Sequence, residues 1–285
     1  MGAILVTGAT GNVGREVVKQ LLEKGEVVRT GLFSIWTESL PDSSEKVRFD
    51  FADPRTYESA FNGVDRLFLM RPPQISEVEK YLFPVINFSL AKGIKQIVFL
   101  SLQGVQFNIF TPHHKVEKYL RKMKAPFTFI RPNFYMQNLS TFYKEDVRDR
   151  SEIFLPAGKG RTAFVDVRDI GEVVARVLTE AGHLDRAYTL SGPESLDYWQ
   201  IAKILSETLG RDIRYINPSV GQYVKRLSEA NTDPGFIRVQ KMLFFVVRHN
   251  FSASTKSDAQ DLLGRTPTTF EAFANDYRDC WQKIS

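Results

Sequence analysis

The first twenty-five residues show a clear change of hydrophobic pattern. An apolar run over residues 3–7, rich in β-branched side chains, predicts a buried strand. Three glycines follow at positions 8, 11 and 14, and Gly25 provides a helix stop. Between them, apolar residues recur at the spacing of one helix face, at Val13, Val17, Val18, Leu21 and Leu22. The pattern therefore predicts a strand, a glycine-rich turn and a helix in direct succession.

Strands and helices continue to alternate as far as Arg131. Short apolar runs predict further strands, and helical spacing between two of them predicts a helix over residues 78–90 that Pro84 bends. Strands that alternate with helices form a parallel sheet covered on both faces. The predicted fold is therefore α/β, a doubly wound parallel sheet. Its further strands are expected at residues 27–32, 46–49, 64–70, 95–101 and 126–131.

The pattern becomes less regular after Arg131. A capping box over Thr268–Glu271 predicts a last helix with a buried stripe of Phe270, Phe273, Tyr277 and Trp281. Apolar residues 242–247 indicate either an interface or the core of a lobe, so the sequence leaves the oligomeric state open. The other expected elements are a helix carrying Val173, Val174 and Val177, a strand at 187–190, a helix at 196–209 that ends at Gly210, and helical structure over 219–251.

The glycine turn has the arrangement that binds the paired phosphates of a dinucleotide. Gly8 permits a turn that other residues resist, Gly11 lets a phosphate approach the backbone, and Gly14 lets the helix pack closely on the strand. The free N–H groups and the dipole of the helix face the anion. An ordinary strand-to-helix turn is the competing interpretation. The expected phosphate contacts are Gly8, Thr10, Gly11, Asn12, Val13 and Gly14.

The end of the second strand distinguishes NAD from NADP in such folds. An acidic residue there binds the ribose 2′-hydroxyl, whereas a nearby Arg accommodates a 2′-phosphate. This chain has Phe33 and Ser34 at that point, and Arg29 lies inside the strand. The lack of Asp or Glu at 32–34 favours NADP over NAD, with Ser34 as a phosphate donor.

Other strand ends provide further expected contacts, because a parallel sheet binds its ligand beyond the carboxyl ends of its strands. Asp50 follows the third strand and is the candidate to lie beside the adenine; a turn or helix-cap role is the equal alternative, since a helix start follows directly. Met70 and Arg71 end the fourth strand and are expected on the nicotinamide side. Ser101 and Pro132 follow at the ends of the fifth and sixth strands.

Composition excludes several classes of function. The 285 residues fit one large α/β domain with a smaller dependent lobe. Cys280 is the single cysteine, so we expect no intramolecular disulfide and a reducing, cytoplasmic location. No apolar run approaches the ~20 residues that span a bilayer, and a core strand begins at residue 3, so neither a membrane span nor a signal peptide is expected.

The net charge of +5 is spread among acidic residues, which argues against nucleic-acid binding. The four histidines show no metal-ligand spacing, so no metal is expected.

Four segments resemble signatures of the NmrA-like atypical short-chain dehydrogenases/reductases: residues 110–117, 129–138, 164–170 and 265–271. The glycine spacing at 8, 11 and 14 likewise resembles the extended and atypical members of that superfamily. The resemblance implies an NAD(P)-binding Rossmann domain with a small C-terminal lobe. Some members of the family reduce quinones, azo dyes or triphenylmethane dyes with NAD(P)H. Others bind the dinucleotide without turning it over and act as redox-sensing regulators.

The resemblance also directs attention to a missing catalytic pair. Short-chain dehydrogenases normally use a Tyr as proton donor and a Lys four residues later. Here those positions fall on Ile109 and His113, so the pair is absent. His113 is the first candidate to hold the ribose or the nicotinamide amide, with helix capping or packing as the alternative. Ser101 and Tyr135 are the candidates to polarise an acceptor.

We therefore expect an NAD(P)H-dependent oxidoreductase that transfers hydride to small conjugated acceptors, quinone-like or dye-like. Residues 1–150 are expected to form mainly the NAD(P)-binding domain, and residues 151–285 mainly a smaller α/β substrate-side lobe interleaved with it. The alternative is a non-catalytic NADP-sensing regulator that binds a protein partner. Epimerase or dehydratase chemistry on a nucleotide sugar is a third reading, opposed by the missing Tyr and Lys. The expected aromatic walls are Phe107, Phe110, Phe134, Tyr135 and Tyr143.

Overall fold

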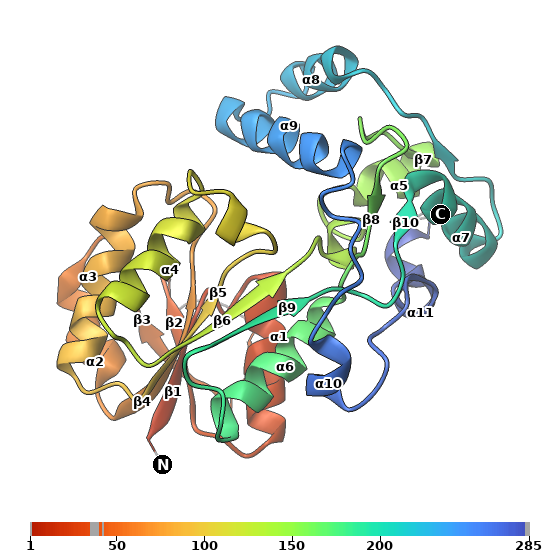
Figure 1. Ribbon diagram of the computed structural model, residues 1–285. Coiled ribbons are helices and arrows are strands. Elements are labelled where there is room, and N and C mark those ends of the chain that lie inside the picture. Colours follow the sequence, from red (N-terminus) through yellow and green to blue (C-terminus); the bar gives the residue numbers. More distant parts are fainter. Residues whose placement is uncertain (1, 35–39, 42, 283–285) are drawn as a thin grey trace. The chain divides into compact units, whose positions relative to one another are not determined.

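A parallel sheet of seven strands organises the larger part of the chain (Figure 1). The computed structural model describes residues 2–34, 40–41 and 43–282. These residues divide into two units, the first formed by ranges 1–132, 167–190 and 258–265, and the second by 133–166, 191–257 and 266–285. Each unit therefore contains segments from distant parts of the sequence.

The sheet of the first unit has the strand order β3-β2-β1-β4-β5-β6-β9, and every neighbouring pair is parallel. The order reverses between β1 and β4, which is the point where open parallel sheets bind ligands. The prediction of a doubly wound parallel sheet is confirmed. The strands are β1 (Ala3–Thr7), β2 (Val28–Leu32), β3 (Glu45–Arg48), β4 (Val64–Met70), β5 (Gln96–Leu100), β6 (Phe127–Pro132) and β9 (Arg186–Leu190).

Helices cover both faces of this sheet. Figure 1 shows α2, α3 and α4 on one face and α1 and α6 on the other. Helix α1 packs against α6, and α3 packs against α4. Pro84 lies inside α3, as predicted. The helical segments are α1 (Asn12–Glu23), η1 (Pro54–Thr56), α2 (Tyr57–Phe61), α3 (Val78–Ala91), η2 (Val105–Phe107), α4 (Pro112–Lys122), α6 (Val167–Thr179) and α10 (Ala259–Leu263).

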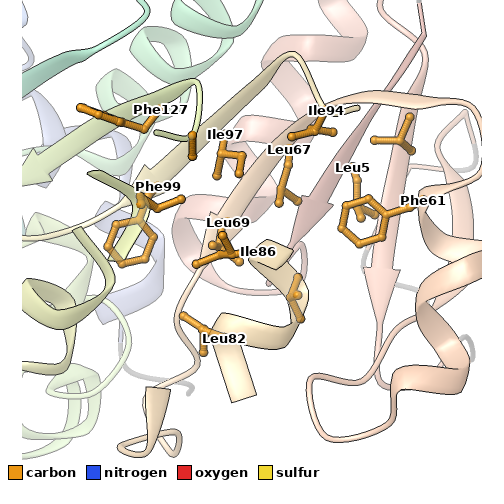
Figure 2. Packing of buried hydrophobic residues seen from close by; sticks show 14 of the residues in the cluster. Leu5, Phe61, Leu67, Leu69, Leu82, Ile86, Ile94, Ile97, Phe99 and Phe127 are labelled. Atoms are coloured by element: carbon orange, nitrogen blue, oxygen red, sulfur yellow. The ribbon is translucent and has the colours of Figure 1, made fainter. Parts of the chain in front are cut away.

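The core under α2 and α3 fixes the strands in register. Figure 2 shows side chains of β1, β4 and β5 packed against both helices. Strand residues two apart point to the same face, so Leu67 and Leu69 of β4 and Ile97 and Phe99 of β5 enter this core together, fully buried. Each such side chain stabilises the fold by about 1.5–3 kcal/mol. The strand ends that carry the candidate site are therefore held by a rigid scaffold.

The second unit is built from helices and two short two-stranded ladders. Strand β8 pairs antiparallel with β10, and β7 pairs parallel with β11. No helix among the described residues is both long and apolar enough to cross a bilayer. The elements of this unit are η3 (Met136–Asn138), α5 (Lys144–Arg150), β7 (Glu152–Ile153), β8 (Arg161–Thr162), β10 (Leu196–Asp197), α7 (Tyr198–Leu209), β11 (Arg214–Tyr215), α8 (Val220–Glu229), α9 (Pro234–Arg248), α11 (Phe270–Asp276) and η4 (Arg278–Trp281).

Helix α7 ends where the sequence predicts but begins later. Gly210 terminates it with φ +65°, the left-handed conformation that favours glycine. At the other end, residues 196–197 form β10 and pair with β8, so the expected start at residue 196 is wrong. Asp197 caps the helix instead, in a capping box with Gln200.

The last helix shows a similar one-residue difference. Its N-cap is Thr269, whose hydroxyl accepts the N–H of Ala272 at 3.2 Å, so the expected capping box over Thr268–Glu271 is one residue out of register. The stripe packs inward as predicted, but α11 ends at Asp276, so the expectation that one helix carries all four residues is wrong and Trp281 lies in η4. Phe270, Phe273 and Trp281 are fully buried, and Tyr277 packs half-buried against them.

Candidate functional site

The turn between β1 and α1 has the backbone that the glycine spacing predicts. Gly8 has φ +64°, and a Cβ placed on it would lie 2.1 Å from Cε of Met70. A Cβ on Gly14 would lie 2.1 Å from the carbonyl oxygen of Gly8, so the helix and the turn meet without room for a side chain. A Cβ on Gly11 would make only ordinary contacts, the nearest at 3.4 Å. Conformation and packing explain Gly8 and Gly14, but neither requires glycine at position 11.

The amino end of α1 offers unsatisfied donors. Gly11 is the N-cap, no side chain of the described residues caps the helix, and the first turn of α1 contains no acidic residue. The N–H of Gly11 itself returns to the carbonyl oxygen of Gly8 at 3.0 Å. The N–H groups that follow it, together with the positive end of the helix dipole, suit an anion. The residues present therefore fit the phosphates of a dinucleotide.

Arg29 is already engaged by other groups of the first unit. Its guanidinium forms a bidentate pair with Glu45, at 2.8 and 3.0 Å, and donates to the carbonyl oxygens of Ala60 and Asn62. Phe33 and Ser34 follow β2 and are exposed, Phe33 at 79%. Residues 35–39, which follow in the sequence, lie outside the described residues.

Asp50 closes a turn after β3. Its Oδ1 accepts the N–H of Ala52 at 2.8 Å, and its own N–H donates to Oγ1 of Thr56 at 3.1 Å. This is the turn role that the sequence analysis holds open beside the adenine role. A contact between Asp50 and an adenine ring stays a prediction.

Met70 lies at the point where the strand order reverses. Its N–H donates to Oγ1 of Thr7 at 2.9 Å, and that hydroxyl donates to the carbonyl oxygen of Phe68 at 3.1 Å. These bonds tie the carboxyl ends of β1 and β4 together. The Met70 side chain therefore borders the glycine turn, with its methyl group beside Gly8.

Arg71 and His113 meet just beyond the end of β4. His113 lies in the first turn of α4, which Thr111 caps by accepting the N–H of His114. The Nε–H of Arg71 donates to Nε2 of His113 at 3.5 Å. Burial of the ring and the nearby Arg71 cation lower the pKa of His113 to about 3. His113 is therefore neutral near physiological pH. Its Nδ1 atom is buried and has no hydrogen-bond partner among the described residues.

Ser101 belongs to a buried charged network. Its hydroxyl donates to Oε1 of Glu117 at 2.7 Å, and Glu117 also accepts two hydrogen bonds from Arg131, at 2.9 and 2.6 Å. Helix α4 thus carries both His113 and Glu117, one turn apart on the same side. Polarising an acceptor with the Ser101 hydroxyl would require its bond to Glu117 to break.

The sequence analysis missed three polar side chains of this region. Glu117 and Arg131 are the charged members of the network, and Gln103 has a buried side-chain carbonyl with no partner in the described part of the chain. The N–H of Gln103 donates to the carbonyl oxygen of Pro132 at 2.9 Å, which places the residue between the ends of β5 and β6. The sequence does place two charged residues beside apolar ones, which could have indicated a buried ion pair. Arg131 ends an apolar strand, and Glu117 follows a core valine.

Tyr135 belongs to the second unit, whereas the candidates above belong to the first. Its side chain is half-buried, and burial raises the pKa of its phenol well above the ordinary value. The expected aromatic walls are divided in the same way. Phe107 and Phe110 are strongly exposed in the first unit, each at 86%, whereas Phe134 and Tyr143 pack against the core of the second.

A separate cavity of about 210 Å³ lies in the second unit. Of the aromatic residues expected around a substrate, it includes only Tyr143. No group of three or more His, Cys, Asp or Glu residues arranged to hold a metal occurs in the described ranges. The cavity is lined by Phe142, Tyr143, Asp146, Phe154, Tyr223, Arg226, Leu227, Thr232 and Phe236.

Comparison with known sequences identifies relatives over nearly the whole chain. The model of the NmrA-like family matches residues 1–274. Prestalk A differentiation protein A of Dictyostelium discoideum is 30% identical over 280 residues, which cover 96% of this chain and 92% of that protein. NAD(P)H azoreductase of Xenophilus azovorans is 27% identical over 280 residues, covering 95% of this chain and 96% of the azoreductase.

Solved structures share the fold. Triphenylmethane reductase of Citrobacter sp., solved in complex with NADP(H), superposes with a TM-score of 0.84 at 22% identity and covers 95% of this chain and 98% of its own. NmrA, a negative transcriptional regulator solved with NADP, superposes with a TM-score of 0.77 at 16% identity and covers 96% of this chain and 94% of its own. At these identities the likeness establishes the fold.

Proposed function

This chain belongs to the NmrA-like family, and from that membership we propose that it is an NAD(P)H-dependent reductase of small conjugated acceptors, with NADPH as the reductant. The observation that carries the proposal is the open glycine turn with its uncapped helix end. The azoreductase relative and the NADP(H)-bound triphenylmethane reductase support the choice of cofactor and of a conjugated acceptor. When bound, NADPH supplies the hydride.

Different residues around the glycine turn are proposed to bind different parts of the dinucleotide. The N–H groups of Asn12 and Val13 bind the paired phosphates, and Gly11 leaves room for them to approach. Ser34 is the proposed hydrogen-bond donor to the 2′-phosphate. The proposed contacts of the dinucleotide are Gly8, Thr10, Gly11, Asn12, Val13, Gly14, Phe33, Ser34, Asp50, Met70 and Pro132, whereas Arg71, Ser101 and His113 are proposed to face the bound acceptor beside the nicotinamide.

The protonation states of the candidates support a conjugated acceptor over a simple ketone. His113 is neutral, Ser101 directs its proton to Glu117, and burial keeps Tyr135 protonated. A general acid should have a pKa near the working pH. None of these three groups is therefore suited to give up a proton near neutral pH. A quinone or a dye spreads the charge that hydride transfer delivers over its conjugated system and takes its proton from water afterwards.

The same protonation states suit a second function. A regulator that binds NADP without turning it over needs no proton donor. The structural likeness to the NmrA regulator is the reason to consider this non-catalytic function. In that case the glycine turn only binds the dinucleotide, and binding changes the interaction with a protein partner.

One assay separates the two functions. The purified protein is mixed with NADPH and a panel of quinones and dyes, and oxidation of the nicotinamide is followed by absorbance. Calorimetric titrations with NADP⁺ and NAD⁺ accompany it. The reductase proposal expects turnover with at least one quinone and tighter binding of NADP⁺. Tight binding of NADP⁺ with no turnover on the whole panel would favour the regulator instead.

A further inference from the structure

Arg71 is a half-buried cation with no carboxylate partner among the described residues. One guanidinium nitrogen donates to the backbone carbonyl oxygens of Pro72, Pro73 and Ile75, at 2.9, 3.1 and 2.6 Å. The Nε–H points to His113 at 3.5 Å. Burial lowers the pKa of Arg71, yet a guanidinium remains charged in proteins. Within the described part of the chain, the groups that face this charge are therefore carbonyl dipoles and the imidazole.

The contact with Arg71 sets the tautomer of His113. Because Nε2 accepts a hydrogen bond, it carries the lone pair, and the ring proton must be on Nδ1. That Nδ1–H is buried and unpartnered in the described chain. A buried donor without an acceptor is unfavourable, so its presence beyond the end of β4 indicates a place for an acceptor from outside the protein.

Three neighbouring polar residues of α4 have other partners. Glu117, one turn further along the helix, is occupied by Arg131 and Ser101. Lys115 pairs with Glu79 on α3 at 2.7 Å. The ring of His114 lies 3.2 Å from the carbonyl oxygen of Val105. None of these groups offsets the charge of Arg71 or accepts the Nδ1 proton of His113.

We propose that Arg71 is a positioning residue that holds His113 as a neutral Nδ1–H donor, and that this donor binds the carbonyl oxygen of a quinone-like acceptor. The proposal rests on the reductase function above and narrows its substrate class. As hydride brings two electrons to the acceptor ring, negative charge develops on that oxygen, which later takes a proton from water. His113 keeps its proton throughout, and the nearby positive charge strengthens the hydrogen bond as the oxygen becomes anionic.

The uncompensated charge of Arg71 also discriminates between acceptors. A quinone is neutral and becomes anionic on reduction, so the cation favours its transition state. A triphenylmethane dye is cationic before reduction and is repelled by the same group. The site therefore prefers quinones to cationic dyes.

Nuclear magnetic resonance tests the tautomer directly. Nitrogen-15 spectra of the imidazole in the full-length protein should show His113 as the neutral Nδ1–H form from about pH 5 to about pH 8. Arg71→Met removes the charge and the donor at similar length, so His113 should then titrate toward its ordinary pKa and populate both tautomers. Arg71→Lys keeps the charge and should keep the ring neutral. Arg55→Met, at an exposed arginine, is the matched control and should leave the spectrum unchanged.

Kinetics tests the role toward the acceptor. With NADPH, Arg71→Met should lower kcat/KM for a neutral quinone on the order of ten- to a hundredfold and lower it less for a cationic triphenylmethane dye, while the affinity for NADP⁺ is retained. His113→Asn should lower quinone turnover similarly. Equal losses on both acceptors, or a parallel loss of NADP⁺ affinity, would show that the pair serves the fold or the dinucleotide.

The two experiments separate this inference from the reductase function. An Nε2–H or titrating His113 in a wild-type protein that reduces quinones overturns the Arg71–His113 assignment alone. Lack of turnover with every acceptor overturns the reductase function, and the acceptor role of His113 with it.

Discussion

Glu117 is the buried charge on which the polar side chains beyond β5 and β6 depend. It is 6% exposed, and its two oxygens take both hydrogen bonds of Arg131 and the proton of Ser101. A buried ion pair contributes little against an apolar substitute, but removing one partner leaves the other uncompensated. The network therefore specifies where Ser101 and Arg131 point.

Replacing Glu117 tests this dependence. Glu117→Gln leaves Arg131 buried without a counter-charge, and we expect the free energy of unfolding to fall by about 3–5 kcal/mol. Denaturant unfolding measures it. Glu79→Gln is the control, because the Glu79–Lys115 pair is half-exposed and such a pair contributes about 0–1 kcal/mol. Equal small effects of both variants would mean that solvent reaches the Glu117 network.

His113 predicts a pH dependence of stability. Its pKa is about 3 in the folded protein, below its ordinary value of 6.5. Between these values the unfolded chain binds a proton that the folded chain does not, so stability falls as pH drops, by up to about 1.4 kcal/mol per pH unit. His113→Asn should remove this component. Unfolding free energies of both proteins, measured between about pH 7 and about pH 5, give the two slopes. Parallel slopes would contradict the buried, neutral state of His113.

At the scale of elements, the three glycines of the turn between β1 and α1 differ in what the fold requires of them. Gly8 needs its left-handed conformation, Gly14 needs the close approach of the helix, and Gly11 needs neither. Gly11 has φ −79° and ψ 167°, which any residue adopts. A larger residue at position 11 should therefore fold normally and affect the ligand alone.

Gly11→Val is accordingly expected to weaken dinucleotide binding without unfolding the protein. The branched side chain would occupy the phosphate approach, and we expect a loss of at least about 100-fold, or about 2.7 kcal/mol, in calorimetric titration with NADP⁺. Gly25→Asn, just beyond the opposite end of α1, is the matched control, since its position is open and asparagine tolerates a positive φ. Full affinity in the Gly11 variant would place the phosphates elsewhere.

Features that depend on residues close together in the sequence could be predicted, whereas contacts between distant segments could not. The β1 turn, the parallel strands and the end of α7 at Gly210 depend on local spacing and are predictable. The start of α7 is not, because residues 196–197 pair with a strand more than thirty residues earlier. The Glu117 network and the Arg71–His113 contact likewise join separate elements. A sequence shows their charges but not their partners.

At the scale of the whole molecule, each unit has its own core. In the second unit this core contains Trp281, which is fully buried and donates its indole N–H to the carbonyl oxygen of Leu139 at 3.0 Å. Phe273 packs on its ring edge-on at 5.8 Å. The glycine turn and the Arg71–His113 pair belong to the first unit. Damage to the second core should therefore separate the stability of one unit from ligand binding by the other.

Trp281→Ala provides that separation. Removing a buried tryptophan should destabilise the second unit by about 3–5 kcal/mol, which hydrogen exchange would report as faster exchange across α7 and α11 and unchanged protection in β1, β4 and β5. Trp199→Ala is the control, because that side chain is 45% exposed. If the first unit alone binds the dinucleotide, calorimetry with NADP⁺ should give the same affinity for both variants. Weaker binding by Trp281→Ala, with the sheet still protected, would mean that the second unit contributes contacts to the dinucleotide.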